Sequence, residues 1–281
     1  VFVGRPYHRL AARATGASAA PLDQFRTKVL QYETMESTNS LERMLQVVDL
    51  IEASDTPVLP DDLMARLDLT RSTLYRYLKT LSEAGLITSF PGVGFALGPR
   101  IAELDFRMRN RDPLIIASRP VMSELVAAIP GIALLCRRYR DTVLCVHQER
   151  GATSFVSTYE RGLARPLFRG AASRIILAYL PPRVIDRLHQ RDKANGVSLA
   201  ELRPELKEMR RRGWDLTESQ VTRGVTGIAA PVFDSRGRIL GSLSLTIGRT
   251  KIPTSEAARI AERVMFCARI VSTSQLQATV E

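Results

Sequence analysis

The sequence predicts an α+β protein with an N-terminal winged helix-turn-helix domain and a larger C-terminal domain of mixed strands and helices. Three observations support this fold class. The chain has 281 residues, which at about 150 residues per domain favours two domains. Residues 40–97 show three short helical patterns followed by a hairpin pattern. Residues 112–281 combine strand-like runs with separate helices.

Composition excludes several classes of protein before any motif is considered. The chain is 45% hydrophobic and 25% charged, which is ordinary for a globular protein. The longest nearly apolar stretch, residues 125–136, contains Pro130 and Gly131 and is too short for a bilayer span, so no membrane partner is expected. Three cysteines without C-x-x-C spacing favour a reducing, cytoplasmic location over a disulfide framework or a zinc site.

The net charge of +11 is distributed unevenly, with +3 in residues 1–34, −4 in residues 35–107 and +12 in residues 108–281. Net charge alone therefore assigns no DNA-binding face. Residues 1–34 show no lasting period and predict a loosely ordered tail. Because Met35 stands directly before the first capped helical pattern, we expect native translation to begin there.

Two helices are predicted at the start of the first domain. The first begins at Ser40, where an Asn39 or Ser40 side chain can cap it. Its apolar residues recur at steps of three and four and predict one apolar face; they are Leu41, Met44, Leu45, Val48 and Ile51. The second is a short helix opened by Pro60 and two acids, and its apolar residues are Leu63, Met64 and Leu67.

A third helix is predicted over residues 71–83, with Thr70 as its cap and Gly85 as its stop. Its inward positions are Leu74, Leu78 and Leu81. Strands at residues 86–90 and 94–97, joined by Pro91 and Gly92, predict the hairpin that completes a winged helix-turn-helix.

The outward side of the third helix carries groups that suit a DNA major groove. Arginine can form bidentate bonds to guanine, and hydroxyl, phenol and ammonium groups can bind phosphates. A solvated amphipathic helix would show similar charges, so the helix alone leaves both interpretations open. The residues predicted to contact DNA are Thr70, Arg71, Ser72, Thr73, Tyr75, Arg76, Lys79 and, in the wing, Gly92.

The elements of the second domain follow from the same patterns. Residues 98–111 predict a helix that links the domains, and residues 114–129 predict another that Pro130 ends. A hairpin over residues 132–136 and 142–147 places Cys136 opposite Cys145. Further strands are predicted at residues 153–158, 164–168, 227–233 and 239–247. Further helices are predicted at residues 170–180, 183–191, 199–212 and 256–274, the third with a capping box from Ser198 to Glu201 and a stop at Gly213.

Several short segments carry a resemblance to a known family. They are residues 40–45, 69–81, 83–86, 95–100, 174–181, 213–214 and 224–234. In order and spacing they resemble IclR-type bacterial transcriptional regulators, over about residues 39–275. The resemblance implies a DNA-binding domain at residues 35–97, a linker helix at 98–111 and, at 112–281, a GAF-like antiparallel-sheet domain that binds a small organic acid effector. It also implies a homodimer or dimer of dimers, with contacts through residues 41–51 and the linker, on double-stranded DNA with a near-palindromic operator.

Two features of the second domain suit a carboxylate ligand. Small residues at 170–173 open a helix after a strand and expose backbone N–H groups, and Ser244 and Thr246 alternate with leucines. Tight packing and hydroxyls that face water are the alternatives. The family's effector pattern implies that Gly170, Ala171, Thr217, Gly227, Ser244 and Thr246 bind the effector. Many members have an acid in place of Thr217 and a cysteine in place of Gly227, which implies a larger or differently charged ligand here. Arg165 and Arg169 are expected to be solvated.

The sequence gives no sign of a catalytic, metal or cofactor site. Its three histidines are scattered, and no nucleophile, phosphate-loop or dinucleotide motif occurs. We therefore predict a transcription factor controlled by a small carboxylate or aromatic acid of a catabolic pathway. The alternatives are a metabolite sensor or scaffold whose winged helix does not bind DNA, and an enzyme that uses the C-terminal pocket. Cys136 and Cys145 are interpreted as buried hydrophobes, with oxidant sensing as the alternative.

Overall fold

The computed structural model describes residues 39–155, 157–192, 196–249 and 252–277. The expected tail at residues 1–34 and the expected start at Met35 lie outside the described residues. The chain divides into two compact units between Asp105 and Phe106. Within the described ranges, no helix is both long and apolar enough to cross a membrane.

The first unit has the order of elements that the sequence predicts for a winged helix-turn-helix. Its elements are α2 (Ser40–Glu52), α3 (Pro60–Leu67), α4 (Arg71–Glu83), β1 (Ile87–Phe90), β2 (Gly94–Leu97) and the first part of α5 (Arg100–Arg111). The strands β1 and β2 pair antiparallel and form the wing. Val58 ties the wing to the helices, because it exchanges two backbone hydrogen bonds of 2.8 and 2.9 Å with Phe95.

The helix α2 begins as predicted, and its predicted apolar face is buried only in part. The Asn39 side chain accepts hydrogen bonds from the first-turn N–H groups, and the Glu42 carboxylate accepts one from the Asn39 N–H. Leu41 and Leu45 are 68% and 56% exposed. Of the other predicted residues, Ile51 is buried, and Met44 and Val48 are partly buried against the core. The core also takes Val47 and Leu50, which were not predicted. A three-helix unit of this size covers only part of the apolar surface of α2.

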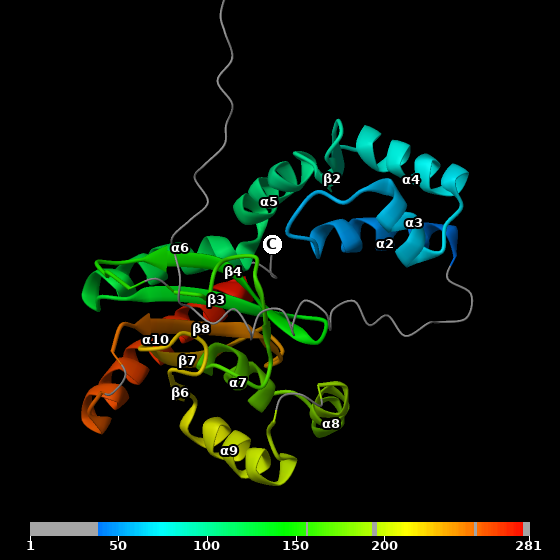
Figure 1. The fold of residues 1–281 in the computed structure, drawn as a ribbon. Coiled ribbons are helices and arrows are strands. Elements are labelled where there is room, and N and C mark those ends of the chain that lie inside the picture. The colour runs from blue at the N-terminus through cyan, green and yellow to red at the C-terminus, as the bar shows by residue number, and fades with distance from the viewer. Residues whose placement is uncertain (1–38, 156, 193–195, 250–251, 278–281) are drawn as a thin grey trace, which may run out of the picture. The chain divides into compact units, whose positions relative to one another are not determined.

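The second unit is built on a six-stranded antiparallel sheet with the order β5-β4-β3-β8-β7-β6 (Figure 1). The strands are β3 (Ile132–Tyr139), β4 (Thr142–Arg150), β5 (Ala164–Pro166), β6 (Asp215–Glu218), β7 (Thr226–Phe233) and β8 (Ile239–Ile247). The predicted hairpin is confirmed, and Cys136 pairs directly with Cys145.

Helices cover both faces of this sheet and form two apolar cores. One core contains side chains of α6 (Pro113–Ala128) and α10 (Thr254–Gln277). The other contains side chains of α7 (Ala171–Ala178), α8 (Pro182–Arg191) and α9 (Leu199–Arg212). The strand β8 alternates as predicted, with Leu243 and Leu245 in the first core and with Ser242 bonded to the backbone of α7 on the other face.

Three details of the second unit differ from the sequence predictions. The described residues of 153–158 form no strand, because Thr158 hydrogen-bonds to a loop at Thr222 and not to a sheet edge. The short strand β6 was not predicted, since its four residues begin and end with acids. Ser198 makes no capping hydrogen bond to α9; both Ser198 and Glu201 are exposed, so water can satisfy the first-turn N–H groups. The predicted stop at Gly213 is confirmed by its φ of 80°.

Candidate DNA-contact surface and effector pocket

The helix α4 has a buried apolar side and an exposed polar side. Leu74, Leu78 and Leu81 are buried as predicted. Tyr77 is buried as well, and its hydroxyl lies 2.8 Å from that of Ser40 at the start of α2. These contacts fix the rotation of α4, so the exposed side presents a defined set of residues: Arg71, Ser72, Tyr75, Arg76 and Lys79.

The side chain of Thr70 is already engaged at the start of α4. Its Oγ1 accepts a hydrogen bond from the Thr73 N–H at 3.4 Å and donates one to Thr73 Oγ1 at 3.0 Å. Thr70 therefore holds the first turn in place. Since its hydroxyl proton is used, a direct role for this side chain in binding phosphate requires that this bond be exchanged.

Two cations of α4 have weak partners on the same helix. The Arg71 guanidinium lies 5.6 Å from the centre of the Tyr75 ring, one helical turn further on. Lys79 faces Glu83 at 3.9 Å, but both side chains are highly exposed and such a pair contributes little. Lys79 is consequently available to a phosphate.

The tip of the wing is apolar and has no basic side chain. Gly92 has a φ of +74° and open space around its Cα. Its neighbours Phe90 and Val93 are 48% and 55% exposed, and residues 86–97 contain no lysine or arginine. A contact of this tip, residues 90–93, with DNA would therefore use the backbone and apolar side chains.

A small cavity of about 40 Å³ lies at the start of α7 in the second unit. The six residues predicted to bind the effector all line it, and they are Gly170, Ala171, Thr217, Gly227, Ser244 and Thr246. The sheet register brings them together, because Gly227 pairs with Thr217 on one side and with Thr246 on the other. Sequence reasoning missed several lining residues in irregular loops, where periodicity gives no signal: Ser157, Tyr159, Gln220 and Thr222.

The two backbone N–H groups at the start of α7 are satisfied by neutral side chains. Gly170 N–H donates to Gln220 Oε1 and Ala171 N–H donates to Thr217 Oγ1, each at 3.0 Å. The Ser244 Oγ beside them is buried and has no hydrogen-bond partner among the described residues. The cavity thus contains three polar groups that a ligand could engage, two of them by replacing a neutral oxygen.

Two loops that reach this cavity are hydrogen-bonded to each other. Thr158 N–H donates to Thr222 Oγ1 at 3.1 Å, and the two threonine hydroxyls lie 2.7 Å apart. Deeper in the wall, the Tyr159 hydroxyl lies 3.1 Å from Ser173 Oγ. Burial raises the pKa of Tyr159 well above its ordinary value, so this wall stays uncharged.

Arg165 is buried, which contradicts the expectation that it is solvated. Arg169 is exposed, as expected. Arg165 is only 7% exposed, because β5 pairs with β4 at Val143 and turns this side chain inward. Its guanidinium lies 5.6 Å from the centre of the Tyr159 ring, and burial lowers the pKa of Arg165. A buried cation therefore stands behind the aromatic wall of the pocket.

Two further buried groups support the fold and do not line the cavity. Burial raises the pKa of the Cys136 thiol well above its ordinary value, which favours a buried hydrophobe over an oxidant sensor. Asp215 is 1% exposed and pairs with Arg212 at 2.8 Å and with Arg174 at 3.1 Å. Burial raises the pKa of Asp215 although both arginines oppose this shift, and the cluster joins β6 to α7 and α9.

A winged helix-turn-helix with an exposed cationic helix, followed by a separate sheet domain with its own cavity, defines the class of two-domain DNA-binding regulators. Residues 40–89 match the IclR helix-turn-helix domain, and residues 107–273 match the C-terminal domain of bacterial transcriptional regulators of the IclR type. The chain belongs to the IclR family and is a DNA-binding transcriptional regulator. This family membership excludes the enzyme alternative.

Individual relatives are similar over most of their length. The chain is 25% identical over 240 residues to the HTH-type transcriptional regulator BhcR of Paracoccus denitrificans, covering 83% of this chain and 86% of the relative. It is 23% identical over 255 residues to the Pca regulon regulatory protein of Pseudomonas putida, covering 88% and 87%. The crystal structure of an IclR transcriptional regulator from Alicyclobacillus acidocaldarius has a TM-score of 0.71 at 20% identity, covering 85% of this chain and 100% of that one. This likeness establishes the fold.

Proposed function

We propose that this regulator binds a near-palindromic operator and that a small organic acid effector of a catabolic pathway controls the binding. In this proposal residues 35–97 bind DNA, residues 98–111 link the domains and residues 112–281 bind the effector. The helix α4 enters the major groove and the wing contacts the backbone. The contacting residues are Thr70, Arg71, Ser72, Thr73, Tyr75, Arg76, Lys79 and Gly92.

The polar arrangement at the start of α7 carries the effector part of the proposal. A carboxylate can accept both N–H groups in place of Gln220 Oε1 and Thr217 Oγ1, at the positive end of a helix. Ser244 Oγ–H donates a third hydrogen bond to the carboxylate, which gives this buried hydroxyl the partner that it lacks. Charge-assisted bonds of this kind are stronger than the neutral bonds they replace.

The size of the cavity selects among carboxylates. About 40 Å³ has room for little more than one or two water molecules. A ligand must therefore displace Gln220 and, if it is bulky, part Thr158 from Thr222. A small aliphatic carboxylate needs less displacement than an aromatic acid, so we propose the former as the effector class.

Exposed apolar side chains support self-association of the regulator as a dimer or dimer of dimers. Leu41 and Leu45 on α2 face solvent. None of the residues of α5 is buried, and it exposes Leu104, Phe106 and Met108 by 42%, 60% and 49%. Two copies that pair through such surfaces would present two α4 helices to two half-sites of an operator.

The DNA part is tested by selecting bound duplexes from a random pool with the full chain. We expect an inverted repeat whose affinity falls about tenfold or more in Arg76→Ala, the loss typical of an arginine that contacts a base. The control is Arg211→Ala, an equal change of charge at an exposed position of α9. Weak, steeply salt-dependent binding without a consensus would overturn the proposal and favour a sensor whose winged helix does not bind DNA.

The effector part is tested by thermal-shift screening of aliphatic and aromatic monocarboxylates, followed by calorimetry. We expect Ser244→Ala to weaken the best ligand by about 1 kcal/mol, or fivefold, through the lost hydrogen bond. Ser242→Ala is the matched control, because Ser242 lies on the same strand, donates to the Ala172 carbonyl at 2.7 Å and does not line the cavity. Equal weakening in both variants would count against the site, and a preference for aromatic acids against the proposed class.

A further inference from the structure

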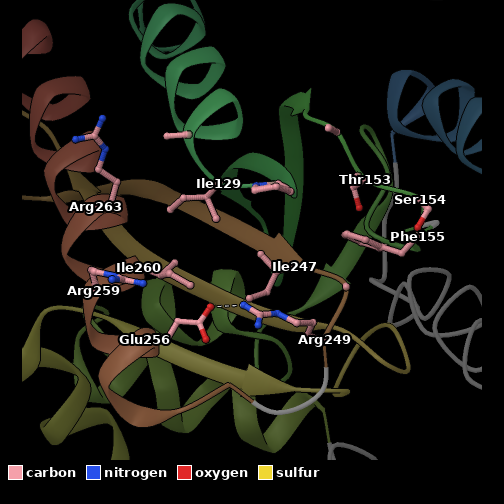
Figure 2. Close-up of a pocket in the computed structure, with 14 residues that line it drawn as sticks. Ile129, Thr153, Ser154, Phe155, Ile247, Arg249, Glu256, Arg259, Ile260 and Arg263 are labelled. Atoms are coloured by element: carbon pink, nitrogen blue, oxygen red, sulfur yellow. Dashed lines mark hydrogen bonds and ion pairs between the residues drawn. The ribbon is translucent and has the colours of Figure 1, made fainter.

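A second, larger cavity lies on the opposite face of the sheet, wholly within the second unit. Its volume is about 750 Å³, in the range of pockets that hold small organic ligands. Figure 2 shows its walls, which are the end of α6, residues 152–155, the end of β8 and one side of α10. Thr246 and Ile247 are neighbours on β8, and the first lines the small cavity while the second lines the large one.

The floor of the large cavity is apolar. It is formed by Ile129, Pro130, Phe155, Ile247 and Ile260. Ile247 and Ile260 are only 4% and 5% exposed and belong to the core below. The ring of Phe155 is placed by Gly248, since a Cβ at that residue would stand 2.8 Å from Phe155 Cδ1. The floor is thus a defined surface against which a flat or branched apolar group can pack.

The rim of the cavity is cationic. Three arginines and one acid line it, and the acid, Glu256, pairs with Arg249 (Figure 2). Arg259 and Arg263 lie four residues apart on α10 and so share one side of the helix. Within the described parts of the chain neither forms an ion pair with a carboxylate, and Arg263 instead lies 6.0 Å from the Phe266 ring. Two guanidinium groups are therefore left to an external anion.

We infer that this cavity binds an amphipathic organic anion, at a site separate from the proposed effector pocket. The carboxylate or sulfonate of the ligand would bind Arg259 and Arg263, whose planar forks match such groups. Its apolar body would rest on Ile129, Ile247 and Ile260. An apolar floor with a few convergent charged groups is the general design of small-molecule sites.

The probe for the test is 8-anilinonaphthalene-1-sulfonate, an aromatic sulfonate that becomes fluorescent when it leaves water. We expect saturable binding to the full chain and at least fivefold weaker binding in Arg259→Gln and in Arg263→Gln. Arg269→Gln is the matched control, because Arg269 is exposed on the same helix and does not line the cavity. Equal loss in this control would overturn the inference, since it would show attraction to net charge alone.

Two further measurements keep the result specific. N-phenyl-1-naphthylamine has the same aromatic body without the sulfonate, and its affinity is expected to be equal in all three variants. If the affinity for this uncharged amine falls in the same variants as the affinity for the sulfonate, the substitutions disturb the fold, and recognition of the charge is refuted. Ser244→Ala is expected to leave the sulfonate affinity unchanged, and a loss there would place the probe in the small cavity and overturn the second site.

Discussion

Gly170 lines the small pocket and has a backbone conformation that favours glycine. It has a φ of +82°, and a Cβ there would stand 2.7 Å from Val221 Cγ2, which belongs to a residue that lines the cavity. We expect Gly170→Ala to lower the free energy of unfolding by more than the roughly 1–2 kcal/mol that a left-handed L-residue costs. Gly162→Ala separates the two causes, because Gly162 has a φ of +83° in open space. Urea titrations measure both, and equal losses would contradict the role of Val221.

Individual residues were predicted correctly where their burial is decided by neighbours in the sequence, and incorrectly where it is decided by contacts distant in the sequence. Leu74 and Leu78 were predicted correctly, because helical period alone decides which side of α4 they occupy. Gln220 was missed because its partner Gly170 is fifty residues away in the chain and lies in another element. Arg165 was wrongly placed in solvent because the pairing of β5 with β4, which turns it inward, leaves no trace in the neighbouring residues. The six residues that were predicted correctly to line the small pocket came largely from the family resemblance.

Among the elements, the turn between β7 and β8 gives a pH-dependent prediction. The Asp234 carboxylate accepts hydrogen bonds from the Arg238 N–H at 2.8 Å, the Arg236 N–H at 2.9 Å and Arg238 Nε at 2.7 Å. These bonds, the Arg238 N–H first among them, hold the pKa of Asp234 below its ordinary value. A carboxyl group whose pKa is lower in the folded state than in the unfolded state stabilises the fold at pH values above its ordinary pKa of about 3.9. This stability is lost as the pH falls through the folded-state pKa.

We therefore expect Asp234→Asn to be less stable than the unsubstituted protein at neutral pH and to lose less stability on acidification below about pH 4. Arg238→Gln is the matched variant, since it keeps both backbone hydrogen bonds and should retain most of the acid sensitivity. Urea unfolding over a pH series measures the effect. An Asp234→Asn curve parallel to that of the unsubstituted protein would show that this carboxylate does not couple folding to pH.

The elements that sequence reasoning missed share a physical cause. Long helices and the strand β8 were found because their periods persist over many residues. The strand β6 has four residues, and its first, Asp215, is a buried acid held by Arg174 and Arg212. From sequence alone such a segment predicts a polar loop, because the arginines of α7 and α9 that pair with Asp215 are recognised only in the folded structure. The pattern at residues 153–158 predicts a strand, but there Phe155 packs over Gly248 and no strand forms among the described residues.

For the whole molecule, the proposed control of DNA binding requires that effector and operator favour different arrangements of the paired copies. An effector can shift such an equilibrium only by its differential affinity for the two arrangements. The helix α5 is continuous across the division between the two units, and its exposed apolar residues are the surface on which the proposed pairing depends. Removing that surface should therefore affect assembly and DNA binding together.

We expect the double substitution Leu104→Ser and Met108→Ser to shift the full chain toward a monomer in sedimentation experiments at micromolar concentration. These residues lie one helical turn apart and are 42% and 49% exposed, so the change removes apolar contact area without opening a core. Affinity for an inverted repeat should fall more than affinity for a single half-site, because only the former uses two paired copies. Ile116→Ser, at an apolar position of α6 that is 48% exposed, should leave both properties unchanged. An unaltered mass of the assembly in the double variant would show that the copies do not pair through these residues of α5.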